Sequence, residues 1–198
     1  MLEMKKISLL AVALILSITA CKNQKKEQGT EQMTEEPAMA KKALDSDIQV
    51  IKIALEPKSD SNVSGTITFT QENGSVTMAA NIEGLTEGTH AIHIHEKSDC
   101  SSPDGTSAGG HWNPTNQPHG KWGSPEGYHK GDIGNFTAGA DGKGSITFST
   151  DEWCIGCGDD TKDILGKGII VHEGADDFTS QPSGAAGTRV SCAGIIKN

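Results

Sequence analysis

Thr89-His-Ala-Ile-His-Ile-His-Glu96 is the stretch that decides the fold of this chain of 198 residues. Apolar residues and histidines alternate along it, and alternation with a period of two is typical of a β-strand. Successive side chains of a strand point to opposite faces, so Ile92 and Ile94 share one face. His93 and His95 share the other face. We expect the isoleucines to face a hydrophobic core and the two histidines to point outward from it.

The chain has seven histidines, and their positions predict a metal site. His90 shares the face of Ile92 and Ile94, so we expect it to pack in the interior and not to bind metal. The other six histidines and one aspartate predict a cage for two metal ions, because histidine is the commonest protein ligand for transition metals. The residues of this cage are His93, His95, His111, His119, His129, Asp132 and His172.

Further segments with the strand pattern, separated by turn residues, predict an all-β domain. The dipeptide Asn73-Gly74 favours a hairpin turn, because both residues tolerate positive φ. The segments cover residues 50–55, 64–70, 75–82, 131–138, 144–149, 168–172 and 188–196. With residues 89–95 they make eight strands without a convincing amphipathic helix, which predicts an antiparallel sandwich or flattened barrel.

Two long segments without the strand pattern lie next to the histidines. Residues 96–130 are rich in Gly, Pro and Ser, and residues 173–187 follow His172 directly. Loops of this length are usually functional or disordered. We therefore expect both loops to cover a metal site on the outside of the barrel.

The first residues predict an export signal and a tether. Residues 1–20 combine a basic start with an apolar run that is too short for a spanning helix, as in a signal peptide. The residues before Cys21 resemble a bacterial lipobox, which implies cleavage there and a lipid on Cys21. An ordinary secretory signal with an incidental cysteine is the alternative. Residues 21–46 are polar and predict a disordered tether, and residues 47–198 are expected to form the folded domain.

Composition restricts the partners and the compartment. The formal net charge is −9, which argues against nucleic acid, and against any membrane contact other than the N-terminal lipid anchor. Besides Cys21, four cysteines remain, and an even number in an exported domain suggests two disulfides. These are Cys100, Cys154, Cys157 and Cys192. We expect a lipid-anchored location in the cell envelope, either periplasmic or on the outer surface.

Six ordered blocks of residues 47–198 resemble the copper,zinc superoxide dismutase family. A single His-x-His motif is weak evidence for any family, but six matching blocks in the same order are specific evidence. They are His93-Ile-His95, Ser107-Ala-Gly-Gly-His-Trp-Asn-Pro114, Pro118-His119-Gly120, His129-Lys-Gly-Asp-Ile-Gly-Asn135, Val171-His-Glu-Gly-Ala-Asp-Asp177 and Gly187-Thr-Arg-Val-Ser-Cys192. The resemblance implies an eight-stranded antiparallel Greek-key β-barrel.

The resemblance also implies a ligand set for each metal. Copper ligands would be His93, His95, His111 and His172, and zinc ligands would be His111, His119, His129 and Asp132. His111 would then bridge the two metals and carry a proton during catalysis. Imidazole suits both copper and zinc, and the carboxylate distinguishes the zinc site from the all-histidine copper site.

Supporting residues follow from the same resemblance. Asp176 would link a copper-ligand histidine to a zinc-ligand histidine, and Arg189 would stand beside the copper. Cys100 and Cys192 would form the intrasubunit disulfide. For Cys154 and Cys157 we expect a local disulfide, with an additional metal site as the alternative. No βαβ context surrounds this pair, so thioredoxin-type exchange is not expected.

The implied reaction is the disproportionation of superoxide to oxygen and hydrogen peroxide, by copper cycling between Cu(II) and Cu(I) beside a structural zinc. The alternative is a non-catalytic copper- and zinc-binding surface lipoprotein on the same fold, because fold does not determine function. Family members are often homodimers, but monomers occur, so the resemblance leaves the assembly open between the two.

Overall fold

The computed structural model describes residues 48–197. Apart from the short 3-10 helix η1 (Thr106–Ala108), its regular elements are strands. These are β1 (Gln49–Pro57), β2 (Ser64–Glu72), β3 (Ser75–Glu83), β4 (Gly88–His95), β5 (Gly134–Ala138), β6 (Gly144–Thr150), β7 (Gly168–His172) and β8 (Arg189–Gly194). No helix in this part of the chain is long and apolar enough to cross a membrane. The predicted signal peptide (1–20), lipidated Cys21 and tether (21–46) lie outside the described residues.

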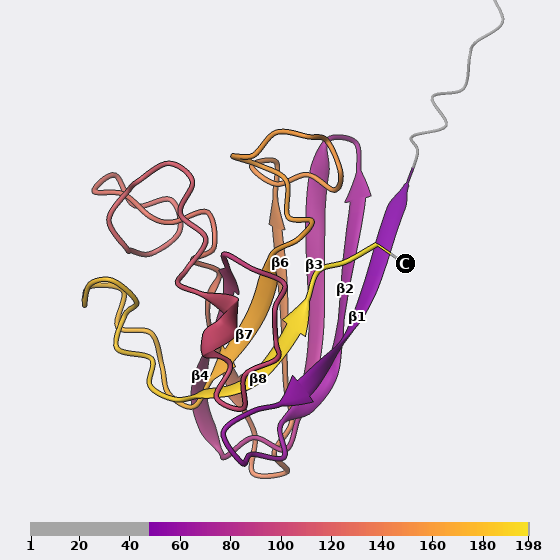
Figure 1. Cartoon of the computed structure of the whole chain (residues 1–198). Coiled ribbons are helices and arrows are strands. Elements are labelled where there is room, and N and C mark those ends of the chain that lie inside the picture. The colour runs from indigo at the N-terminus through magenta and orange to yellow at the C-terminus, as the bar shows by residue number, and fades with distance from the viewer. Residues whose placement is uncertain (1–47, 198) are drawn as a thin grey trace, which may run out of the picture. The chain divides into compact units, whose positions relative to one another are not determined.

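The strands form a closed barrel in the order β1-β2-β3-β6-β5-β4-β7-β8 (Figure 1). All neighbouring strands pair antiparallel. The chain passes from β3 across the barrel to β4 and returns through β5 to β6, which pairs with β3, so the connection is of the Greek-key type. The predicted all-β, eight-stranded antiparallel Greek-key barrel is therefore confirmed.

Short-range sequence signals account for the first three strands. Glu72 pairs with Ser75 across the hairpin, so the turn contains only Asn73 and Gly74. Both turn residues have positive φ, 51° and 82°, as a two-residue turn of this kind requires. Buried and less buried residues alternate along β1, β2 and β3, because one face of each strand packs into the core.

Strand β4 is buried on both faces. Ile92 and Ile94 lie in the hydrophobic core inside the barrel, as predicted. His93 and His95 lie on the opposite face and are still only 0% and 1% exposed, because loops cover that face. His90 is buried against Phe136, with 5.9 Å between the ring centroids. Its position away from the other six histidines agrees with the predicted packing role.

The predicted start of the fifth strand is wrong. Residues 131–133 are not part of β5, which begins at Gly134. The carbonyl of Gly131 instead accepts a hydrogen bond from the amide of Ile94 (2.9 Å), and its own amide donates to Trp112 (3.0 Å). These long-range contacts turn the chain so that Asp132 faces the histidines. The last strand also ends earlier than predicted, at Gly194 and not at residue 196.

A β-bulge places Arg189 opposite His172. Val171 pairs with Ser191 and His172 pairs with Arg189, so Val190 is the extra residue of the bulge. Directly opposed residues of an antiparallel pair share a face. Bulges commonly re-aim side chains beside functional sites, and this one brings the Arg189 side chain to the outer face that carries His172.

Two long loops cover that outer face. They comprise residues 96–133 and 173–188 and project from the same side of the barrel (Figure 1). The side chain of Gln181 joins them, since it accepts a hydrogen bond from the amide of His119 (2.9 Å) and donates one to its carbonyl (2.8 Å). The Cys100–Cys192 disulfide fixes the first loop to β8. Both expected disulfides are present, the second joining Cys154 and Cys157.

Candidate metal centre

The structure brings the seven predicted cage residues together in two buried groups. The donor atoms within each group all lie within 4.8 Å of one another. The first donor group is His93, His95, His111 and His172, and the second donor group is His111, His119, His129 and Asp132. His111 belongs to both, so the two groups form one continuous centre.

Each of the six histidines has one buried ring nitrogen without a hydrogen-bond partner. These atoms are His93 Nδ1, His95 Nε2, His111 Nε2, His119 Nδ1, His129 Nδ1 and His172 Nε2. A buried polar atom without a partner costs free energy, and such atoms are rare in native proteins. Six of them converging on two points indicate that the cage is built for cations, which the nitrogen lone pairs would coordinate.

The opposite ring nitrogens determine which atom is free to coordinate. His95 Nδ1 donates a hydrogen bond to the carbonyl of Gly109 at 2.9 Å, and His172 Nδ1 donates to the carbonyl of Gly187 at 3.3 Å. A carbonyl only accepts, so each Nδ1 carries the proton and each Nε2 keeps its lone pair. Outer hydrogen bonds of this kind fix the tautomer and orientation of metal-binding histidines.

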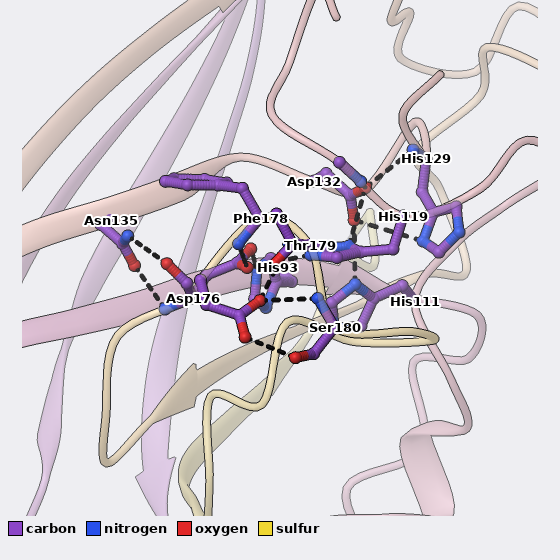
Figure 2. A network of polar contacts seen from close by, with 12 residues as sticks. His93, His111, His119, His129, Asp132, Asn135, Asp176, Phe178, Thr179 and Ser180 are labelled. Carbon is purple, nitrogen blue, oxygen red and sulfur yellow. Dashed lines mark hydrogen bonds and ion pairs between the residues drawn. The ribbon is translucent and has the colours of Figure 1, made fainter. Parts of the chain in front are cut away.

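Asp176 connects the two groups, as Figure 2 shows. Its Oδ2 accepts a hydrogen bond from His93 Nε2 at 2.8 Å, and its Oδ1 accepts one from His119 Nε2 at 2.9 Å. Asn135 holds the backbone of Asp176, since its side chain donates to the Asp176 carbonyl and accepts from the Asp176 amide, both at 2.8 Å. The sequence had indicated Asp176, but the supporting role of Asn135 emerges only from the structure.

Asp132 lies at the middle of the second donor group. Its carboxylate is 2.9 Å from His111 Nδ1, 3.0 Å from His119 Nδ1 and 3.3 Å from His129 Nδ1. It also accepts a hydrogen bond from the backbone amide of His129 at 2.8 Å. Burial opposes the charge of this carboxylate, but the hydrogen bond from His111 Nδ1 and the close approach of the His119 and His129 rings outweigh burial and hold the pKa of Asp132 far below its usual range.

Burial keeps three histidines of the first donor group, His95, His111 and His172, neutral at pH 7. Burial lowers the pKa of His111 to about 4, although Asp132 opposes the shift. Burial, with a smaller contribution from the neighbouring His93, lowers the pKa of His172 to about 3. The pKa of His95 is also well below its usual value, mainly through burial. Only a deprotonated imidazole nitrogen binds metal, so these shifts favour coordination.

The second donor group behaves differently. Burial disfavours a charge on His119, but Asp132 and Asp176 outweigh it and raise the pKa of His119 to about 9 in the metal-free protein. A metal cation between His119 and Asp132 would take the place of that proton. Carboxylate and imidazole donors together suit zinc.

A cleft of ≈ 390 Å³ borders both groups. Its lining includes His95, His111, His129, His172, Glu96 and Arg189. Among the described residues, Arg189 is the only lysine or arginine that lines this cleft. Its Nη1 donates a hydrogen bond to the carbonyl of Gly105 at 2.9 Å. Guanidinium groups stay charged in proteins, so Arg189 gives the cleft a fixed positive charge.

A third group of donor side chains lies away from this centre, at Cys154, Cys157 and Asp163. The two sulfur atoms form a disulfide, so they are not thiolate ligands in this structure. The Asp163 carboxylate accepts hydrogen bonds from the amides of Gly156 and Gly158. The expected local disulfide is thus present, whereas the alternative of an additional metal site has no free sulfur donors.

Comparisons with known proteins agree with this geometry. The family model described as copper/zinc superoxide dismutase matches residues 63–195. The extracellular superoxide dismutase (Cu-Zn) of Brugia pahangi is 38% identical over 153 residues, which cover 73% of this chain and 74% of that protein. The superoxide dismutase-like protein YojM of Bacillus subtilis (strain 168) is 39% identical over 109 residues, covering 54% of this chain and 55% of that protein.

Solved structures show the same fold. The crystal structure of a superoxide dismutase-like protein from Bacillus subtilis has a TM-score of 0.65 and 32% identity, and covers 73% of this chain and 97% of that chain. A double mutant of that protein has a TM-score of 0.66 and 33% identity, and covers 74% of this chain and 97% of that chain.

Proposed function

The chain belongs to the copper/zinc superoxide dismutase family, and from this membership we propose that it disproportionates superoxide to oxygen and hydrogen peroxide. Two superoxide ions and two protons give one molecule of each product. The family implies copper and zinc as cofactors. The observation that carries the proposal is the pair of buried donor groups that share His111, with six unpartnered ring nitrogens directed into them.

The donor sets support one metal for each group. His93, His95, His111 and His172 would hold copper, because an all-imidazole site suits that metal. His111, His119, His129 and Asp132 would hold zinc, for which mixed histidine and carboxylate ligation is usual. Copper bound there supplies one-electron redox chemistry that accepts an electron from one superoxide and passes it to a second, whereas zinc supplies charge without redox chemistry.

Arg189 attracts and orients the substrate in this proposal. Superoxide is a small anion, and the protein carries a formal charge of −9. A local positive field in a cleft can outweigh an unfavourable net charge. The guanidinium beside His172 provides that field, and the hydrogen bond to Gly105 keeps it in place.

His111 carries the proton in this proposal. It accepts a proton on Nε2 in the first half of the cycle and gives it to the reduced substrate in the second half. Its Nε2 is a buried ring nitrogen without a hydrogen-bond partner, so it is free to take up this proton. During this proton transfer, the hydrogen bonds to Asp176 keep the rings of His93 and His119 in a fixed orientation.

The disulfides and the N-terminal sequence support a proposal for the location of the protein. Two disulfides and an extracellular curated relative support an extracytoplasmic location. We further propose that residues 1–20 are removed, that Cys21 carries a lipid, and that residues 21–46 tether the domain of residues 47–198 to a membrane of the cell envelope. Mass spectrometry of the mature N-terminus tests this, because an unmodified Cys21 excludes the anchor.

A non-catalytic metal-binding role is the second candidate. It is favoured by one observation, that the Bacillus subtilis relatives bear the description superoxide dismutase-like. The test is an assay of superoxide decay with the protein loaded with copper and zinc, beside protein loaded with zinc alone. If superoxide decays faster only in the sample that contains copper, the result supports the enzyme. If protein loaded with both metals does not change the rate of superoxide decay, the result supports the binding role.

A further inference from the structure

The two halves of the centre differ in how the fold supports them. His93 and His95 lie on β4 and His172 on β7, so hydrogen-bonded strands position them. By contrast, His119, His129 and Asp132 all lie on the loop of residues 96–133, which has no strand of its own. Sites on loops are held less accurately than sites on strands or helices unless other residues fix them. The second donor group therefore needs external support.

Glu152 supplies part of that support from the segment after β6. Its Oε1 accepts a hydrogen bond from the Tyr128 hydroxyl at 2.6 Å, and its Oε2 forms an ion pair with the Lys130 ammonium. Tyr128 and Lys130 are the residues immediately before and after His129. One carboxylate thus holds the chain on both sides of a single candidate ligand.

Trp153 supplies a second anchor. Its indole N–H donates to the carbonyl of Lys130 at 2.8 Å, and the side chain is only 1% exposed. Trp122, three residues after His119, packs against both Tyr128 and Trp153, with ring centroids 4.8 Å and 5.8 Å apart. The same aromatic cluster therefore contacts the chain near His119 as well as the chain at His129.

The Cys154–Cys157 disulfide directly follows these two anchors. Residues 154–157 are also fixed by hydrogen bonds, from the amide of Ile155 to the Gln71 side chain (2.6 Å) and from the amide of Gly156 to Asp163 (2.9 Å). Cys154 itself donates its amide to the carbonyl of Lys162 at 2.8 Å. The disulfide closes a short covalent ring, which restricts the backbone directly after Trp153.

We propose that Glu152 and Trp153 are positioning residues for the second donor group and that the Cys154–Cys157 disulfide holds them in place. The proposal rests on the proposed function, because it takes zinc as the ion bound by that group. The zinc affinity of the protein then depends on a covalent bond outside the metal centre. His93, His95 and His172, which lie on strands, do not depend on it.

The experiment compares zinc and copper affinities by competition with chromophoric chelators. The proteins are the full-length wild type, Trp153→Phe, Glu152→Gln, and the double variant Cys154→Ala/Cys157→Ala. Asp151→Asn is the matched control, because Asp151 is an exposed neighbour of Glu152. The visible absorption of cobalt(II) bound in place of zinc reports the geometry of the site. Trp153→Phe keeps an aromatic ring in the buried cluster but removes the indole N–H together with part of the ring volume.

We expect zinc to bind about 10-fold more weakly in the Trp153, Glu152 and double-cysteine variants, as is typical when a residue that orients a ligand is lost. We also expect altered cobalt(II) spectra, with copper affinity unchanged and the Asp151 control like the wild type. Equal zinc affinity and equal spectra in folded Trp153→Phe overturn the proposal, whether or not the double variant folds. A parallel loss of copper affinity also overturns it. A wild type that binds neither zinc nor cobalt overturns the zinc assignment together with this proposal.

Discussion

Gly184 packs so closely against Asp176 that an ideal Cβ on Gly184 would lie 1.8 Å from Asp176 Oδ1. The same Cβ would lie 2.7 Å from His119 Nε2. Gly184 also has a φ of 68°, where other L residues are strained. The second loop therefore needs glycine here to let its backbone approach the carboxylate that joins the two halves of the centre.

Replacing Gly184 by alanine should displace Asp176 and weaken the hold on both His93 and His119. We expect the loss of a ligand-orienting contact to lower metal affinity by about 10–100-fold. The control is Gly166→Ala, because Gly166 has a φ of 78° and no atom within 4 Å of the added Cβ. Metal affinities of both variants are measured by chelator competition. The comparison separates the effect of the clash with Asp176 from the effect of backbone strain, which both variants share. Equal metal affinities in the two variants would contradict the role given to Gly184.

Arg189→Ile should slow superoxide decay and reduce its dependence on salt, while copper stays bound. The reason is that Arg189 contributes a fixed charge to the cleft but does not belong to either donor group. Salt screens attraction between separated charges, with a Debye length of about 10 Å at 0.1 M ionic strength. Arg189→Lys, which keeps the charge, should retain more of the salt dependence. An unchanged second-order rate constant at low salt would exclude this role.

The metal-free protein should be most stable near pH 6.5. The pKa of His119 is raised to about 9, so its stabilisation is complete below 6.5 and is lost as the pH rises to about 9. The pKa values of His111 and His172 are lowered to about 4 and about 3, so stability is lost as the pH falls below 6.5. Thermal melting in chelator from pH 4 to pH 9 measures this dependence.

Zinc loading supplies the control for that prediction. Zinc replaces the proton on His119, so the decline of stability between pH 6.5 and pH 9 should disappear in zinc-loaded protein. A melting temperature of metal-free protein that rises steadily from pH 4 to pH 9 would show that His119 is not the dominant titrating group.

The two disulfides should contribute unequally to stability. Cys100 and Cys192 are 92 residues apart, and the loop-closure estimate for that bond is about 4–5 kcal/mol. Cys154 and Cys157 are 3 residues apart, for which the same estimate gives about 2 kcal/mol. Denaturant unfolding of the two double alanine variants compares them. A larger loss for the shorter ring would contradict the estimate and would indicate that its contacts matter more than its closure.

Strand parity was sufficient to predict the two faces of β4. Ile92 and His93 are neighbours in sequence, and local pleating alone sends one to the core and the other to the metal centre. The six blocks that resemble the family, taken in order, then indicated the family and the Greek-key barrel. These features depend on local geometry or on long matched segments, so the sequence carries them directly.

Several contacts between distant segments were not predicted, apart from those that the family resemblance implied. The bulge at Val190 appears only once β7 and β8 are paired, because it is a mismatch between two strands. The strand that contains Phe136 starts late because Gly131 bonds to residues of β4 and of the first loop. The anchoring of the His129 segment by Glu152 and Trp153 likewise joins positions 22 and 23 residues apart. No periodicity in the sequence marks such contacts.

The most direct test of the central claim is a copper titration of zinc-loaded protein, followed by the rate of superoxide decay. The account predicts that the rate rises linearly with added copper and levels off when one copper per chain is bound at the His93, His95 and His172 side of the centre. Substituting His172 by alanine should abolish that rise while zinc stays bound. Protein that holds one copper and one zinc per chain and leaves superoxide decaying at its spontaneous rate would contradict the account.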